Sequence, residues 1–260
     1  FLSLELSRMC TAIAPSPTLA IDAKAKEMRL NGRDVVSFSV GEPDFVTPQY
    51  IRTAAHEALD MGLTKYTPAA GTLGLRRAIC EKLRWDNGLE YSPSEVIVSN
   101  GAKFSIYAAL AAIVNPGDEV IIFDPVDLLF GISARYAGAT VVYYSPKHEN
   151  GHWDFSDLES YVTDKTRMIG LCNPHNPLGL LYTEGELRTI ATVAAEHDLW
   201  IMNDEIWSDI IYSERPFVSI NSLGPELNKK TISFYGFSKG FALPGLRAGY
   251  LCLLYTSDAA

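Results

Sequence analysis

The chain has few of the features that mark metal, disulfide or nucleic-acid-binding proteins. Its four cysteines, at positions 10, 80, 172 and 252, form no Cys-x-x-Cys pair, which disfavours both a disulfide framework and a zinc site. Of the five histidines, only His148 and His152 are four residues apart, and they lie in a polar stretch rather than in an expected helix, so we predict no metal site. The formal net charge is −9 without any basic run, which argues against nucleic acid or an anionic membrane as a partner.

Long hydrophobic runs are also missing. Glu5 and Arg8 stand where a signal peptide would have its apolar centre, and no later run reaches membrane-spanning length. We therefore expect a soluble, cytoplasmic protein. With 260 residues and a hydrophobic content of 47%, the chain can form one large domain and part of a second.

Nucleotide-binding glycine motifs are absent, but the chain does alternate apolar runs with helical patterns. Neither Gly-x-Gly-x-x-Gly nor a Walker pattern occurs, so a dinucleotide or nucleoside triphosphate is not the natural ligand. Strands are expected at residues 34–40, 96–99, 119–123, 140–144, 168–172, 199–203 and 231–235, and helices at 16–30, 49–61, 73–85, around 158 and 183–197. This order predicts an α/β fold, a doubly wound, mostly parallel sheet with helices on both faces and ligand groups at the carboxyl ends of strands.

A lysine follows the last expected strand. The β-branched and aromatic run 231–235 stops at Gly236, and a small-residue loop then presents Ser238 and Lys239. An amine at the end of a buried strand can be partly desolvated and can attack a carbonyl. The ordinary alternative is a solvated surface lysine.

An arginine eight positions further on extends this pattern. Arg247 lies between Gly245 and Gly249, where backbone can approach a ligand closely and a guanidinium can grip an anion. The Ser-Lys, small loop, Gly-x-Arg-x-Gly-Tyr pattern resembles the cofactor-lysine region of the class I and II aminotransferases, which depend on pyridoxal 5′-phosphate (PLP) and have the fold-type I architecture. The resemblance implies that Lys239 forms an aldimine with PLP and that Arg247 and Ser238 bind its phosphate.

Two further strand ends fit the same family. Gly101, Ala102 and Lys103 follow the strand 96–99 and begin a helix, a geometry that points free N–H groups at a phosphate; they match the family's phosphate-binding positions. The stretch Asn173-Pro-His-Asn-Pro-Leu-Gly179 is similar to the family's Pro-x-Asn-Pro-x-Gly signature. That similarity implies that Asn176 contacts both the cofactor's O3′ and the substrate carboxylate.

A fourth strand end carries an acid. Asp204-Glu-Ile-Trp207 resembles the family's Asp-Glu-Ile-Tyr, in which the aspartate pairs with the pyridinium nitrogen of the cofactor. A helix N-cap is the structural alternative for Asp204. Trp207 replaces the expected tyrosine, and because an indole N–H can donate but neither accept nor ionise, the cofactor phenolate should be tuned differently.

The family pattern is also broken after Pro125. Aspartate aminotransferases usually have an aromatic pair there, one ring of which stacks on the pyridine, whereas this chain has Val126 and Asp127. Either Phe130 supplies a ring or aliphatic atoms cover that face. We do not expect Asp127 to belong to the site.

Two stretches resemble parts of the family's site that lie further from the lysine. Gly41-Glu-Pro-Asp-Phe is similar to the loop whose glycine N–H faces the substrate carboxylate, which implies a substrate-binding role for Gly41. Thr64-Lys-Tyr66 begins a stretch similar to the one whose tyrosine reaches the cofactor phosphate of the neighbouring subunit. That role for Tyr66 implies a homodimer.

The resemblance covers about residues 16–251 and predicts three parts. Residues 1–46 are expected to hold the N-terminal segment of the small domain and the substrate loop, and residues 47–251 the PLP-binding large domain. Residues 252–260 read as an atypical tail, with the C-terminal small domain absent and the chain therefore truncated.

The expected function is transfer of an amino group between an L-amino acid and a 2-oxo acid through the Lys239 aldimine. A PLP-dependent carbon–sulfur β-lyase is an alternative, because Pro-His-Asn-Pro is common in such enzymes and Trp207 replaces tyrosine. A truncated, non-catalytic PLP-binding fragment is a second alternative. Lys239 and Asp204 are the expected catalytic residues, and the sequence does not tell which amino acid is used.

Overall fold

A computed structural model describes residues 5–11, 15–149 and 152–254. The chain divides into two compact units, residues 1–46 and residues 47–260. The first unit contains α1 (Arg8–Thr11) and α2 (Pro17–Leu30). Helix α2 begins as its sequence indicates, because the Ser16 side chain accepts the N–H of Leu19 and a proline occupies the first helical position.

The strand expected at residues 34–40 is wrong, since these residues form extended and bent backbone without a ladder. Alternating apolar and polar residues favour a strand only where a neighbouring strand offers hydrogen bonds. Within the described part of the first unit, both regular elements are helices.

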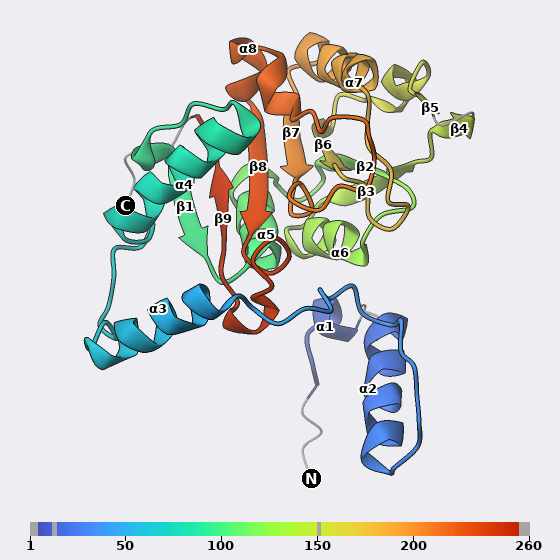
Figure 1. The fold of residues 1–260 in the computed structure, drawn as a ribbon. Coiled ribbons are helices and arrows are strands. Elements are labelled where there is room, and N and C mark those ends of the chain that lie inside the picture. The colour runs from blue at the N-terminus through green and yellow to red at the C-terminus, as the bar shows by residue number, and fades with distance from the viewer. Residues whose placement is uncertain (1–4, 12–14, 150–151, 255–260) are drawn as a thin grey trace. The chain divides into compact units, whose positions relative to one another are not determined.

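The second unit consists of a seven-stranded sheet, the helices around it and a small hairpin (Figure 1). Its helices are α3 (Gln49–Asp60), α4 (Leu73–Asn87), α5 (Ala102–Ile113), α6 (Leu128–Tyr136), α7 (Glu184–Glu196) and α8 (Pro225–Asn228). The strands of the sheet are β1 (Val96–Ser99), β2 (Glu119–Phe123), β3 (Thr140–Tyr144), β6 (Thr166–Cys172), β7 (Trp200–Asp204), β8 (Thr231–Gly236) and β9 (Gly249–Cys252). The hairpin pairs β4 (Lys147–Glu149) with β5 (His152–Asp154).

The strand order brings the carboxyl ends of most strands to one edge. The order is β1-β9-β8-β7-β6-β2-β3, and all pairs between β8 and β3 are parallel. Strand β9 runs antiparallel to both β1 and β8, so β1 points the same way as β8. We call the edge where these strands end, and where β9 begins, the carboxyl edge.

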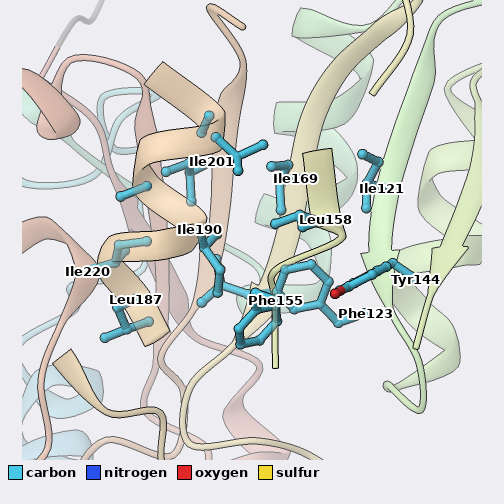
Figure 2. Packing of buried hydrophobic residues seen from close by; sticks show 14 of the residues in the cluster. Ile121, Phe123, Tyr144, Phe155, Leu158, Ile169, Leu187, Ile190, Ile201 and Ile220 are labelled. Atoms are coloured by element: carbon cyan, nitrogen blue, oxygen red, sulfur yellow. The ribbon is translucent and has the colours of Figure 1, made fainter. Parts of the chain in front are cut away.

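The sheet is buried on both faces, as expected for parallel strands. On one face, Ile121, Ile169 and Ile201 pack with Leu187 and Ile190 of α7 (Figure 2). On the other, the alternate residues of the same strands pack with α5 and α6; they include Val120, Ile122, Met168 and Met202. Each fully buried side chain of this kind contributes about 2 kcal/mol. The doubly wound architecture with helices on both faces is confirmed.

Three local features differ from expectation. The helix expected around residue 158 is a short 3₁₀ turn, Leu158–Tyr161, and the β4–β5 hairpin and β9 were not anticipated. Cys252, the first residue of the expected tail, is the last residue of β9 and pairs with Val96. Among the residues that the structure describes, no helix is long and apolar enough to cross a bilayer.

Candidate active site

Three neighbouring strands carry Lys239, Asp204 and Asn176 to the carboxyl edge. Lys239 follows β8, Asp204 ends β7 and Asn176 follows β6, and these strands are adjacent in the sheet. Backbone bonds hold the strand ends together: Asn173 N–H donates to the Asp204 carbonyl at 2.9 Å. Glu205 N–H similarly donates to the Phe234 carbonyl of β8 at 3.0 Å. The register of the sheet therefore sets the spacing of the three side chains.

Gly101 and Arg247 form a close contact at the same edge. Gly101 has φ +89°, a conformation that favours glycine, and a Cβ at that position would lie 2.6 Å from Arg247 Nη2. A Cβ at Gly249 would overlap the backbone N of Ala102. Because β9 starts at this edge, it carries Arg247 against the start of α5, where Arg247 Nη1 also donates to the Pro244 carbonyl at 2.9 Å.

The start of α5 adds hydrogen-bond donors to this contact. The first N–H groups of any α-helix, here those of Ala102 and Lys103, have no partner within the helix, and the helix dipole is positive there. A hydrogen bond links the end of β1 to α5, since the hydroxyl oxygens of Ser99 and Ser105 lie 2.5 Å apart. The guanidinium of Arg247 and these N–H groups together make an anion-binding arrangement. The Lys103 side chain is exposed.

Lys239 lies against an aromatic ring. Its Nζ is 4.4 Å from the centroid of the Trp207 ring, a distance at which an ammonium is attracted to the ring face. The loop is closed by Ala242 N–H, which donates to the Lys239 carbonyl at 3.0 Å. Ser238, next to the lysine, is buried. Trp207 thus has a direct contact with the lysine that its position in the sequence did not reveal.

Asp204 is a buried acid with an unusual proton affinity. Its residue is only 8% exposed, and Oδ1 accepts the N–H of Ile206 at 3.0 Å. Burial raises the pKa of Asp204 to about 7, although the Ile206 N–H acts in the opposite direction, and the negative charges of Asp127 and Glu205 add to the rise. Such a carboxyl group can hold or share a proton near neutral pH.

Glu205 points to the other face of β7, since successive residues of a strand alternate. Its carboxylate accepts from the Tyr235 hydroxyl at 2.6 Å and from Asn203 Nδ2 at 2.6 Å. Asn203 Nδ2 also donates to Ser233 Oγ at 3.2 Å, and Ser233 in turn donates to Asn221 Oδ1 at 3.0 Å. Burial raises the pKa of Glu205 too, and these hydrogen bonds oppose the rise.

Sequence reasoning missed Asp127. Its Oδ2 accepts from Asn176 Nδ2 at 3.4 Å, and its Oδ1 caps α6 by accepting the N–H of Leu129 at 3.0 Å. An aspartate four residues after a strand end, beside the break in the aromatic pattern, was the available signal. Phe130, the suggested source of a stacking ring, is fully buried in the core under α6, so that suggestion is wrong.

Tyr66 and Gly41 keep their expected roles as predictions. The Tyr66 side chain is fully exposed, and Gly41 lies in the first unit. His175, the neighbour of Asn176, packs with its ring centroid 5.4 Å from that of Trp153. Burial lowers the pKa of His175 to about 4, which keeps it neutral near physiological pH.

The chain is similar to known aminotransferases. The sequence model of the family described as "Aminotransferase class I and II" matches residues 33–256. "Aspartate aminotransferase" of Bacillus subtilis is 40% identical over 249 residues, which are 95% of this chain and 63% of that protein. The "Aspartate/prephenate aminotransferase" of Thermus thermophilus is 39% identical over 248 residues, again 95% of this chain and 63% of the relative.

The fold agrees with the sequence comparison. The solved structure of the aspartate aminotransferase from Thermus thermophilus with maleate superposes with a TM-score of 0.91 at 38% identity, covering 96% of this chain and 65% of that one. The fold and the residues at the carboxyl edge thus place this chain in the fold-type I class of enzymes. The chain belongs to the class I and II aminotransferase family, and it spans about 63% of the length of the relatives named above.

Members of this family depend on PLP, and the carboxyl edge fits that cofactor. A phosphate suits the contact of Arg247 with Gly101, where any larger residue would collide with the guanidinium. A positively charged ring nitrogen suits the buried carboxyl of Asp204. An aldehyde suits the amine of Lys239, which lies after the strand adjacent to that of Asp204.

Proposed function

We propose that this chain binds PLP and belongs to an enzyme that moves an amino group between an L-amino acid and a 2-oxo acid. The observation that carries the proposal is the meeting of Lys239, Asp204 and Asn176 with Arg247 at one edge of one sheet. The relatives named above are aminotransferases, which favours transfer over carbon–sulfur lysis.

The side chains would divide the binding of the cofactor among them. Arg247, Ser238 and the backbone N–H groups of residues 101–103 would hold the phosphate. Lys239 would hold the cofactor covalently, and Asn176 would orient its O3′ and the substrate carboxylate. Trp207, whose ring lies beside Lys239 Nζ, would line the same space.

Two residues would handle protons. PLP supplies an electron sink for the bond that breaks at the amino acid's Cα. The buried carboxylate of Asp204 would keep the ring nitrogen protonated, because a cation at that position relieves the cost of burying its charge. The amine of Lys239, released when the substrate takes its place, would accept the proton from Cα and return it during transfer.

The remaining assignments concern parts of the site outside the sheet edge. We propose that the N–H of Gly41 faces the substrate carboxylate and that Tyr66 reaches the phosphate site of a second subunit in a homodimer. Full exposure of an aromatic side chain at Tyr66 is in keeping with a partner there. A domain boundary near residue 46 and a cytoplasmic location belong to the same proposal.

An amino-transfer assay tests the proposal. The PLP-loaded chain is given a panel of amino acids with one 2-oxo acid, and the amino acid that corresponds to that oxo acid is measured, beside the Lys239→Ala variant. Transfer that requires the oxo acid and Lys239 supports the proposal. Release of pyruvate and ammonia from cystathionine without an oxo acid would instead support the lyase. Cofactor binding without either reaction would indicate a non-catalytic fragment.

A further inference from the structure

An aspartate lies at the carboxyl edge where the family resemblance leads one to expect an aromatic ring. Asp127 follows β2, the neighbour of β6 in the sheet. Both of its carboxylate oxygens have partners, since Oδ2 accepts from Asn176 Nδ2 at 3.4 Å and Oδ1 accepts from Leu129 N–H at 3.0 Å. A side chain held at both oxygens keeps its charge in one place beside Asn176.

The charge of Asp127 acts on groups at the neighbouring strand ends. Burial is the largest cause of the raised pKa of Asp204, at the end of β7, and the negative charge of Asp127 adds to the rise. It also adds to the rise in the pKa of Cys172, the last residue of β6. A negative charge that acts on these groups acts on any ligand held between them.

The arginine of the anion site lies at the far end of the edge from Asp127. Arg247 precedes β9, and the order β9-β8-β7-β6-β2 places four strand spacings between β9 and β2, or about 19 Å. Lys103 and Lys239 are further cations of this edge, but the partners of the Asp127 carboxylate, Asn176 Nδ2 and Leu129 N–H, are neutral donors. The anion site therefore lies at the β9 end of the edge and Asp127 at the β2 end.

We propose that Asp127 determines substrate choice by disfavouring amino acids with an acidic side chain relative to their neutral counterparts. This inference rests on the proposed function, in which Asn176 contacts the substrate carboxylate. Every amino acid brings an α-carboxylate, so its repulsion from Asp127 is the same for all. A side-chain carboxylate adds a second negative charge near a fixed one, and L-aspartate is accordingly a poor ligand, although relatives carry aspartate in their names.

Isosteric amino acids test the inference, because L-aspartate and L-asparagine differ in charge but hardly in shape. Their dissociation constants for the PLP-loaded chain are measured from the change in the cofactor's absorption, a binding readout that needs no turnover. We expect L-asparagine to bind about tenfold more tightly than L-aspartate. In Asp127→Asn, which keeps the shape and the Leu129 contact, that ratio should fall to about one.

Two further variants serve as controls for the comparison of L-asparagine with L-aspartate. Asp127→Ser keeps a good N-cap for α6 without the charge and should change the ratio as Asp127→Asn does. Asp164→Asn removes an equal charge from an exposed turn before β6, at the opposite edge of the sheet, and should leave the ratio unchanged.

The outcomes separate this inference from the proposed function. Equal affinities in the unmutated chain, or a ratio that persists in both Asp127 variants, would overturn the role of Asp127 alone. No binding of either amino acid by a chain that shows the cofactor band would overturn both the role of Asp127 and the proposed amino transfer. A folded chain without any cofactor band would overturn the proposed function and, with it, this inference.

Discussion

The two faces of β7 at its carboxyl end carry adjacent carboxyl groups with opposite surroundings. Glu205 is completely buried and accepts hydrogen bonds from Tyr235 and Asn203, which belong to the same packed network. Asp204 is almost as buried, and its Oδ1 accepts a hydrogen bond from the backbone N–H of Ile206. The same chemical group thus stabilises the fold on one face and, on the other, keeps a proton affinity suited to a cationic ligand.

This difference shows how a strand end can build a site. Residues 203 and 205 face the network of Ser233 and Tyr235, where the protein itself satisfies the charge, whereas residue 204 faces the edge where β6, β7 and β8 end. A buried acid whose surroundings do not satisfy its charge costs stability unless something else supplies the missing interaction. Burial alone therefore does not distinguish a structural acid from a functional one, but the hydrogen-bond partners do.

The largest effect is expected from breaking the network on the structural face. Glu205→Ala removes the acceptor of the buried Tyr235 hydroxyl and one of the two acceptors of Asn203 Nδ2, which should lower the free energy of unfolding by about 4 kcal/mol. Urea unfolding of the cofactor-free chain measures this. Glu205→Gln keeps one acceptor and should cost clearly less; equal losses in the two variants would argue against the hydrogen-bonded role.

The functional face should show its effect in the pH dependence of stability. The pKa of Asp204 is raised from 3.8 to about 7 in the folded chain, so the folded state binds more protons than the unfolded state between these values. The contribution of Asp204 to stability is therefore greatest below pH 3.8 and is lost as pH rises through 7. Between pH 5 and pH 8, the unmutated chain should lose about 3 kcal/mol more than Asp204→Asn in urea unfolding, and parallel losses would contradict the assignment.

A smaller effect is expected at the anion end of the edge. Arg247→Ala removes the guanidinium beside Gly101, and a lost charge-assisted contact with phosphate should weaken PLP binding by about 2 kcal/mol, or about thirtyfold. Equilibrium titration with PLP measures this. Arg167→Ala serves as the matched control, because Arg167 pairs with Asp118 at the other edge of the sheet. A similar loss in both variants would show that only net charge matters.

Much of this sheet could be predicted from the sequence, because its strands are short β-branched runs between turn residues. The observed bounds of β1, β2 and β3 equal the expected ranges. Strand β9 was missed because the fold sets its place between β8 and β1, which lies more than 150 positions earlier in the chain, and its four residues are too few to show a local pattern. For the same reason residues 34–40 were overpredicted, since their pattern fits a strand without offering a neighbour.

Site residues could be predicted where their neighbours in the sequence mark them. They could not be predicted where their role depends on contacts with distant parts of the chain. Lys239, Asp204, Asn176 and Arg247 stood out by their neighbours in the sequence, and the fold gathers them. Asp127 and the Glu205 network depend on contacts between distant strands, so only the three-dimensional structure reveals them. The contact between Lys239 and Trp207 is of the same kind.

The most direct test of the central claim is to locate the cofactor on the chain. The chain is incubated with PLP, reduced with borohydride to make the attachment permanent and digested, and the peptide that carries the added mass is sequenced by mass spectrometry. The account predicts one modified lysine, Lys239, and loss of the modified peptide in Lys239→Ala. Modification spread over exposed lysines such as Lys229, or unchanged by Lys239→Ala, would contradict it.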